Sequence, residues 1–431
     1  MLKLDDTTGE VLWSQHYASS EGVSEAVMAV VVDDNDDVIG AGRAAIGAAQ
    51  DQVLTMKLDG ASGDILWMET FGGTDNQDDL AWEMAMGADN QPVLAGQVIN
   101  SGGVAEYFVR KIRTSDGSVV WDERGPEAQN NATSQGTWLE LMDNGDAVLC
   151  QRVFGNNGYD VFLKRFDAAT GGTVWQTTYD GPTHGGDDPR AMAQDSAGNL
   201  LVAGVQDANW NYDFMALKVN GETGETMWAA NYDGPPGWYD VGTAVTESAD
   251  GSVVVTGLSD GNGTAWDWAT VAFDPADGSQ QWVMRHDGTA GQSDEPSQIL
   301  AGPTGELIVT GYGYGEGTNQ DLITLCYQTN TLSAADRPPL AAALQRVWPN
   351  PFNPRVNFRF SLPAPAHARL GVFDLRGRRV ATLVDRHLDA GVHDASWDGR
   401  GAHGRNAPAG VYLAIMESGD QRECRKIILA K

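Results

Sequence analysis

The stretch LDDTTGEVLW at residues 4–13 decides the fold, because a variant of it returns at a nearly constant interval. A second copy, FDAATGGTVW, occupies residues 166–175. Each copy joins an apolar strand pattern, a turn that contains Gly and a closing Trp. The closing residues are 54, 54, 54, 53 and 54 positions apart: Trp13, Trp67, Trp121, Trp175, Trp228 and Trp282. A fixed period of this length with strand patterns inside it predicts radially repeated β-blades.

Within one period the pattern predicts four antiparallel strands. Residues 191–194 form a short strand pattern, and residues 195–199 supply turn chemistry. A nearly continuous apolar run follows at residues 200–204, as expected for a strand that is covered on both faces. Residues 214–219 and 226–229 provide the two outer strands.

The last unit, about residues 293–332, contains three strand patterns, and the segment at residues 11–14 matches the missing fourth. Because a ring must cover its two sheet edges, we predict an all-β fold with a six-bladed β-propeller of four-stranded blades over residues 1–332, closed by the N-terminal strand. Residues 1–4 duplicate a third strand that the last unit already has, which indicates more repeat upstream in a natural precursor. The repeated Trp residues are predicted to fill the wedges between neighbouring blades, a structural docking role.

The phrase Asp-x-x-Thr-Gly-x-x-x-Trp, cleanest at residues 5–13 and 167–175, resembles the tryptophan-docking motif of pyrroloquinoline-quinone (PQQ)-type propellers. The longer pattern at residues 239–271 resembles the bacterial propeller repeats called SBBP. Both resemblances imply the architecture of residues 1–332, and both groups include plain scaffolds. The enzyme that the docking motif would suggest is a quinoprotein dehydrogenase, but the adjacent cysteine pair common in that family is missing.

After residue 332 the period stops, and the Pro- and Ala-rich stretch that follows predicts a linker over residues 333–347. WPNPFNP at residues 348–354 opens a different module, in which Gly and Asp turns separate short strand patterns. We predict an Ig-like β-sandwich over residues 348–431.

The landmarks of this module include LGVFDLRGR at residues 370–378 and AGVYL at residues 409–413. They closely resemble the FlgD-like immunoglobulin module used as a C-terminal (Por) sorting domain in type IX secretion. The resemblance implies export across the outer membrane of a diderm bacterium, removal of the module and attachment to the cell surface. Such cargo first crosses the inner membrane, and no signal peptide is visible in this sequence.

The charge of the chain is unevenly distributed. Residues 1–337 carry 14 Lys and Arg against 51 Asp and Glu, whereas residues 338–431 carry 14 against 8, and the net charge is −31. So acidic a first domain disfavours nucleic acid and anionic lipid as partners and is compatible with cation binding. No apolar run is long enough to span a membrane, and the three scattered cysteines indicate neither a disulfide framework nor a metal cluster.

Two acidic series emerge when the repeats are superimposed. The first lies about 12 residues after each Trp, where the innermost strand begins: Glu25, Asp79, Asp187, Asp240 and Asp294. The second precedes the third strand: Asp51, Glu106, Asp160, Asp213, Asp267 and Asp321. If the first series faces the central channel, its carboxylates predict a divalent metal site for Ca²⁺. The alternative, which we favour, is that each Asp accepts backbone N–H bonds at the start of a strand, a role repeated by duplication.

Several aromatic residues fall outside the docking position, in polar loops: Trp210, Tyr212, Trp238, Tyr239 and Trp266. Aromatic rings stack on sugars and carboxylates bind their hydroxyl groups, so these residues predict a ligand face suited to a glycan.

The sequence therefore predicts a secreted or cell-surface protein that acts as a non-catalytic binding or adhesion scaffold. We expect a monomer with a glycan or protein ligand, a C-terminal module that engages the secretion machinery, and no organic cofactor. No catalytic residue is predicted, since a Gly-x-Ser-x-Gly motif and metal-like His spacing are both missing. Two alternatives stay open: a carbohydrate-active enzyme that uses carboxylates on the propeller face, and a structural component of a surface layer.

Overall fold

The computed structural model divides the chain into two compact units, Met1–Thr329 and Asn330–Lys431. Within them it describes residues 1–18, 25–45, 51–73, 79–126, 137–155, 158–207, 211–234, 239–261, 265–287, 292–302, 305–314, 319–328, 343–348, 352–362, 366–374, 378–388, 391–401, 407–418 and 421–430. All regular elements in these ranges are β-strands. Among the described residues, no helix is long and apolar enough to cross a membrane.

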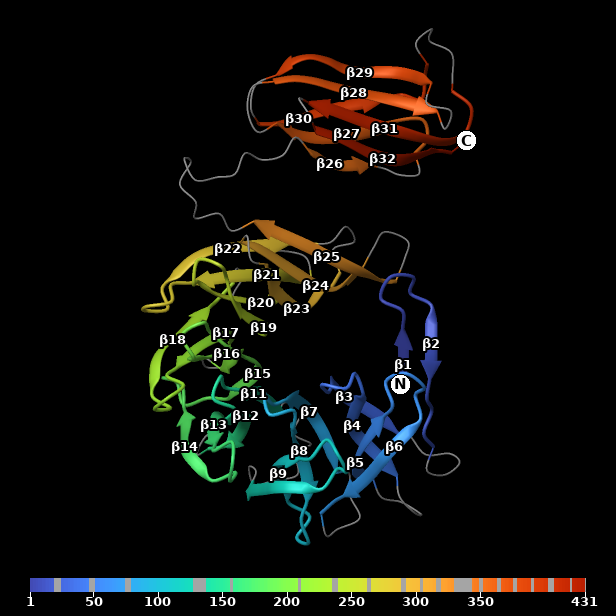
Figure 1. Cartoon of the computed structure of the whole chain (residues 1–431). Coiled ribbons are helices and arrows are strands. Elements are labelled where there is room, and N and C mark those ends of the chain that lie inside the picture. The colour runs from blue at the N-terminus through green and yellow to red at the C-terminus, as the bar shows by residue number, and fades with distance from the viewer. Residues whose placement is uncertain are drawn as a thin grey trace. The chain divides into compact units, whose positions relative to one another are not determined.

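The first unit consists of antiparallel sheets that follow one another along the chain (Figure 1). Five of them have four strands each, in the orders β3–β6, β7–β10, β11–β14, β15–β18 and β19–β22. Their bounds are β3 Ala26–Val32, β4 Val38–Ala45, β5 Asp51–Leu58, β6 Ile65–Phe71, β7 Leu80–Met86, β8 Pro92–Ile99, β9 Ala105–Ile112, β10 Val119–Pro126, β11 Thr137–Leu141, β12 Ala147–Phe154, β13 Tyr159–Phe166, β14 Thr173–Tyr179, β15 Asp187–Gln194, β16 Leu200–Asp207, β17 Tyr212–Val219, β18 Thr226–Tyr232, β19 Asp240–Glu247, β20 Val253–Asp260, β21 Trp266–Phe273 and β22 Gln280–His286. The predicted all-β class and the four-stranded antiparallel sheets are confirmed, and they are consistent with a propeller.

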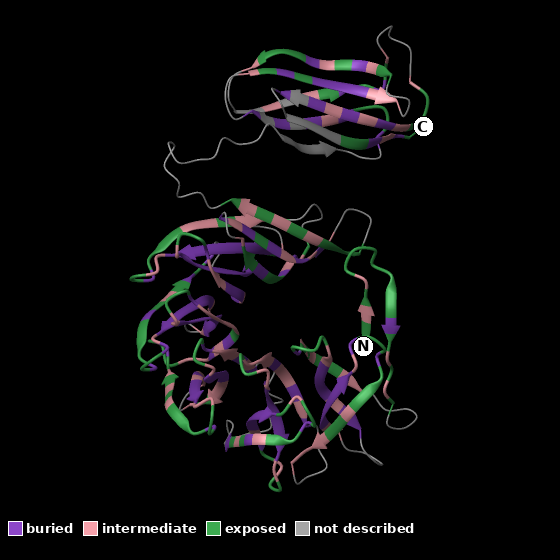
Figure 2. Cartoon of the chain, in the orientation of Figure 1, coloured by how far each residue is buried: buried purple, intermediate pink, exposed green. Residues whose placement is uncertain are grey.

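Neighbouring sheets pack face to face. The first strand of each sheet contacts the first strand of the next, from β3 and β7 through to β19 and β23 (Glu295–Ala301). One core between sheets joins Leu201 and Phe214 to Val255 and Val271, all of them buried. The second strands, such as β8 and β16, are buried almost throughout, whereas the residues of an outer strand such as β6 are exposed or half-buried (Figure 2). Burial on both faces is why the second strands read as continuous apolar runs.

Five of the repeated Trp residues have a described partner in the next sheet. Each of these five packs against the Gly-containing turn of that sheet. Trp228 Nε1 donates a hydrogen bond to the Pro275 carbonyl oxygen at 3.1 Å, and the indole ring lies against Gly278. Gly278 has φ +74°, and a Cβ added there would meet the Trp228 ring at 2.6 Å. The same bond joins four earlier pairs: Trp13 to Gly60 (3.1 Å), Trp67 to Thr114 (2.9 Å), Trp121 to Ala168 (3.1 Å) and Trp175 to Gly221 (2.9 Å). The Trp residues thus connect consecutive sheets.

The two ends of this unit differ from the predicted closure. The last sheet has three strands, β23, β24 (Glu306–Tyr314) and β25 (Gln320–Gln328), and β2 (Val11–Ser14) is not among them. Instead β2 pairs with β1 (Leu2–Leu4) in a separate two-stranded sheet. The physical reason is that β1 already pairs with the edge of β2 on which β25 would have to lie, so β25 cannot add to that edge. The predicted closing pair is therefore wrong for the described strands.

The second unit forms two antiparallel sheets around one core. One sheet has the order β26–β27–β30 and the other β29–β28–β31–β32. Their bounds are β26 Ala343–Trp348, β27 Val356–Leu362, β28 Ala366–Asp374, β29 Arg379–Leu388, β30 Gly391–Trp397, β31 Gly410–Ser418 and β32 Gln421–Leu429. Phe358 and Val372 lie in a shared buried cluster, and Trp397 packs edge-on against Tyr412 at 5.2 Å. The Tyr412 hydroxyl donates to the Pro408 carbonyl oxygen at 2.6 Å, which fixes the start of β31.

The start of this unit corrects the predicted linker of residues 333–347. Ala343–Trp348 form strand β26, which pairs with β27 from Ala343↔Ser361 to Trp348↔Asn357. Leu344 and Val347 lie three positions apart, and the register shifts between Leu344 and Arg346, so no period-two alternation marked this strand in the sequence. Residues 329–342 lie outside the described ranges.

We predict that replacing Gly278 by Ala destabilises the propeller more than replacing Gly251 by Ala. Both glycines have positive φ, +74° at Gly278 and +85° at Gly251, so Ala causes the same kind of backbone strain at both positions. Only at Gly278 does the new methyl group meet an indole ring, and this clash lowers the free energy of unfolding by a further amount of about 1–3 kcal/mol. Urea denaturation of the full chain followed by Trp fluorescence measures both losses. Equal losses would show that the docking contact is not tightly packed.

Candidate functional site

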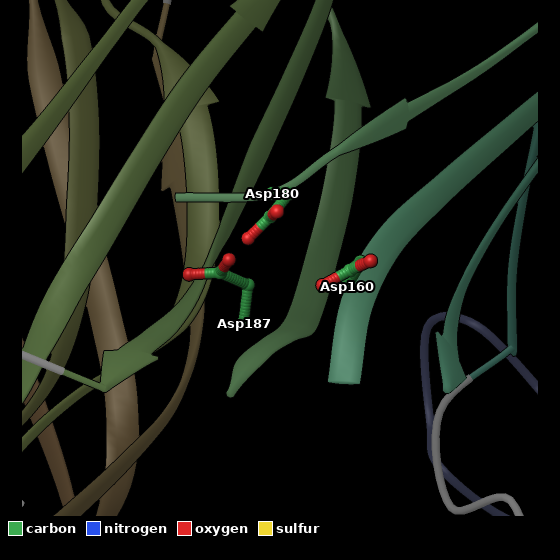
Figure 3. A group of neighbouring side chains, drawn as sticks. All are labelled: Asp160, Asp180 and Asp187. Carbon is green, nitrogen blue, oxygen red and sulfur yellow. The ribbon is translucent and has the colours of Figure 1, made fainter. Parts of the chain in front are cut away.

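The strongest concentration of titratable groups lies where one sheet passes to the next. An Asp at the second position of a third strand is followed after 20 residues by another Asp and after 7 more by a further one, in three copies. We name these the first triad (Asp160, Asp180, Asp187), the second triad (Asp213, Asp233, Asp240) and the third triad (Asp267, Asp287, Asp294). In the first and second triads, one oxygen of each carboxylate lies within 4.8 Å of the others. Figure 3 shows the carboxyl groups of the first triad gathered around a common space.

The topology explains this convergence. Asp213 is the second residue of the third strand β17, just after the connection from β16, and Asp240 begins β19, just after the crossover from β18. Because strands alternate in direction within a sheet, both connections lie at the same end of the sheets. Asp233 follows β18 within that crossover, so it lies between the two.

The first predicted series has a local structural role in the described residues. A Gly six residues earlier donates its backbone N–H to the carboxylate in three copies: Gly73 to Asp79 (2.7 Å), Gly181 to Asp187 (2.6 Å) and Gly234 to Asp240 (2.9 Å). Asp294 accepts the Tyr314 N–H at 3.0 Å, and Glu25 lies half-buried before β3. Asp79, Asp187 and Asp240 therefore hold the crossovers between sheets.

The described structure does not bring the predicted metal residues together around a central channel; it places Asp187 and Asp240 in separate groups. Among the described residues, neither metal-sized group contains two members of the first series. Asp187 and Asp240 each join one member of the second series and one Asp that the sequence interpretation missed, Asp180 or Asp233. The constant spacing of 20 and 7 residues was the signal that could have found them.

Burial and mutual repulsion shift the acidities of both groups. Burial, followed by the charges of Asp160 and Asp180, raises the pKa of Asp187 to about 6. Burial, followed by the charge of Asp233, raises the pKa of Asp213 to about 6.

Asp240 is fully buried. Burial raises its pKa, and the Asp233 charge adds to this, whereas Ser259, Gly234 and Arg285 act in the opposite direction. Its Oδ2 accepts the Gly234 N–H, but its Oδ1 makes no hydrogen bond of normal geometry. A buried carboxylate oxygen is thus left without a full partner in the second triad.

Three of the predicted ligand-face aromatics stack beside the triads. Tyr212 meets Tyr239 edge-on at 5.7 Å between ring centroids, and Tyr239 stacks on Trp266 at 5.4 Å. Trp266 is 37% exposed. Each ring directly precedes a triad Asp in its strand, so the ring and the carboxylate point to opposite faces. Trp210 and Trp238 lie outside the described residues.

The comparisons with known proteins bear first on the second unit. Residues 353–421 match the family model of the FlgD Ig-like domain. This confirms the predicted resemblance of the C-terminal module to FlgD-like immunoglobulin domains. No curated protein matches the chain significantly.

Solved structures are similar to the chain at low sequence identity. One is PorZ, an essential bacterial surface component of the type IX secretion system of Porphyromonas gingivalis, with 14% identity and a TM-score of 0.43. That match covers 93% of this chain and 59% of the PorZ chain. The quinohemoprotein alcohol dehydrogenase from Comamonas testosteroni has 12% identity and a TM-score of 0.50, over 80% of this chain and 66% of its own. The chain thus spans less than two thirds of either protein, and at these identities the likeness concerns the fold alone.

Without divalent metal, we predict that the protein becomes more stable as the pH falls from about 7 to about 5. The pKa values of Asp187 and Asp213 are about 6 when folded, against an ordinary 3.8, so the folded state holds protons more tightly. Their stabilising contribution is fully present below pH about 4 and is lost as the pH rises through about 6. Urea denaturation in EDTA at several pH values measures the slope. The Asp187→Asn/Asp213→Asn variant should have a smaller slope, and an unchanged slope would contradict the assignment.

Proposed function

We propose that this protein is an exported cell-surface scaffold, whose propeller binds a ligand without catalysis and whose C-terminal module directs type IX secretion. The observation that carries the proposal is the FlgD Ig-like match over residues 353–421, on a compact β-sandwich unit at the end of the chain. Its landmarks resemble those of sorting modules in type IX cargo. In this proposal the repeated sheets form a six-bladed, PQQ- or SBBP-like scaffold that acts as a monomer.

The described geometry supports binding rather than catalysis. Asp187 and Asp240 are nearly or fully buried, and each is fixed by a backbone N–H bond. In this arrangement the carboxylates hold the crossovers, and the half-buried Tyr212 and Tyr239 and the exposed Trp266 lie beside them. A surface-layer component would use the same scaffold without a soluble ligand, and a ligand screen separates the two.

Export should depend on the C-terminal unit. We predict that the full chain, expressed with a signal peptide in a type IX-competent bacterium, reaches the cell surface, whereas a variant that ends at Thr329 stays in the periplasm. Protease accessibility on intact cells, with immunoblotting of fractions, measures the location. A strain without the type IX translocon is the control and should retain both forms. Equal surface exposure of the two forms would contradict the proposal.

A glycan is the ligand class that the aromatic stack favours. Tyr212, Tyr239 and Trp266 form a continuous set of rings, and the partly exposed Trp266 ends it. A sugar ring stacks on such a surface while neighbouring polar groups bind its hydroxyls. This observation also keeps the carbohydrate-active enzyme as the second candidate function.

We expect Trp266→Ala to lower the affinity for a glycan at least tenfold without unfolding the protein, because stacking on the indole is lost. Glycan-array binding followed by calorimetry measures the loss. Met284→Ala, which truncates an exposed side chain of the same sheet, is the matched control and should bind normally. Binding that survives Trp266→Ala would exclude this surface, and hydrolysis of the bound sugars would favour the enzyme.

A further inference from the structure

The third triad contains a positive charge supplied by the chain itself. Arg285 Nη2 lies 3.1 Å from Asp267 Oδ2, and the same nitrogen donates to the Asp260 carbonyl oxygen at 2.6 Å. Its Nη1 donates to the Ser259 hydroxyl oxygen. Arg285 stands three residues after the docking residue Trp282. A guanidinium therefore neutralises the Asp at the second position of the third strand of this copy.

The equivalent position in the other two copies is uncharged. Three residues after the docking Trp, the second copy has Asn231 and the first has Thr178. The Asn231 Nδ2 lies 3.5 Å from Asp213 Oδ2, and the Asn211 Nδ2 lies 2.9 Å from Asp213 Oδ1. These contacts place only the positive ends of amide dipoles where the third copy has a full charge.

The first copy is neutralised no better by its described neighbours. His184 Nδ1 lies 2.7 Å from Asp180 Oδ2, but both side chains are exposed, and an imidazole is cationic only when protonated. Asp160 has a raised pKa because of burial first and the Asp180 charge second.

Three buried carboxylates elsewhere in the described part of the propeller are paired with basic side chains. The hairpin carboxylates form ion pairs of 2.7 to 2.8 Å: Asp33 with Lys57, Asp146 with Arg165, and Asp195 with Lys218. These pairs offset the cost of removing a charge from water, whereas the buried Asp79 accepts the backbone N–H groups of Gly73 and Ile99. Among the described residues, Asp187 and Asp213 accept hydrogen bonds from neutral donors, and the charge of Arg285 also acts on Asp240.

A second observation points to a missing cation in the second triad. Asp240 is 0% exposed, and its Oδ1 is buried without a hydrogen bond of normal geometry. The Asn211 Oδ1 is also buried and unpaired, while its Nδ2 faces Asp213 and Asp233. A half-turn of that amide would exchange the nitrogen for a neutral oxygen ligand.

We propose that the first and second triads each bind one Ca²⁺ ion between neighbouring sheets, at the place that Arg285 fills in the third triad. All the available donors are oxygens, and three carboxylates with a carbonyl-type oxygen and water suit a hard cation of flexible coordination. Each ion would join the third strand of one sheet to the first strand of the next, so it would hold the crossover closed. The inference is independent of what the propeller binds.

Calorimetric titration of the EDTA-treated full chain with CaCl₂ tests the proposal. We expect a stoichiometry of two and a melting temperature that rises with calcium concentration. Asp240→Asn should reduce the stoichiometry to one, and Asp187→Asn/Asp240→Asn should abolish binding. Magnesium at the same concentration is the comparison, and an equal shift with magnesium would overturn the calcium assignment.

Two exchange variants test the equivalence of the copies and do not depend on the fate of the Asp variants. Asn231→Arg places a guanidinium in the second triad and should lower the stoichiometry from two to one. Arg285→Asn removes the internal cation and should raise it to three if the variant keeps its native circular dichroism spectrum. Absence of calcium heat and of any melting shift in the wild type would overturn the proposal, as would a stoichiometry of two in Asn231→Arg.

Discussion

The contact between each repeated indole and the glycine of the next turn is the constraint on which the propeller unit depends. At Gly278 the positive φ and the 2.6 Å approach of Trp228 exclude any side chain, so Trp and Gly act as one pair across two sheets. The Nε1 bond to a backbone carbonyl oxygen fixes the height of the ring as well. Because the two partners lie in consecutive repeats, this contact sets the distance from one sheet to the next. It extends to the N-terminal hairpin, where Trp13 lies against Gly63.

The spacing between sheets in turn determines which side chains come together at the crossovers. With neighbouring sheets held together by docking, the start of one third strand and the start of the next first strand are brought within reach of each other. The carboxylates at these two positions, such as Asp213 and Asp240, come from strands of different sheets. Their proximity is a consequence of packing between repeats, and hydrogen bonds such as that from Gly234 hold it.

The strands of the first unit could be predicted from the repeat period and from the pattern of apolar residues. The pairing of strands at the two ends of this unit could not be predicted from the sequence. The strand patterns at residues 200–204 and 214–219 fall within β16 and β17, because continuous apolar runs leave few alternatives. The partner of β2 could not be predicted, since β1 and β25 carry the same strand pattern and local closure favoured β1. In the site, Asp187 and Asp240 could be identified from repetition. Asp180 and Asp233 recur at a constant spacing, but their position beside the other carboxylates could not be predicted, because they lie in crossovers whose path depends on how the sheets pack.

Duplication copies a backbone environment together with its charges, and this explains why the acidic positions differ in their compensation. An Asp at the start of a third strand recurs because the repeat recurs, so each copy must deal separately with a carboxylate that packing has partly buried. Asp51 pairs with Arg43 at 3.2 Å and Asp267 with Arg285 at 3.1 Å, from two different positions of the repeat. Two independent arginines at one kind of carboxylate indicate that a positive charge there is favourable. The copies around Asp160 and Asp213 have the same backbone and a third carboxylate nearby. The need for a positive charge is therefore greatest beside Asp160 and Asp213, where the chain supplies the least of it.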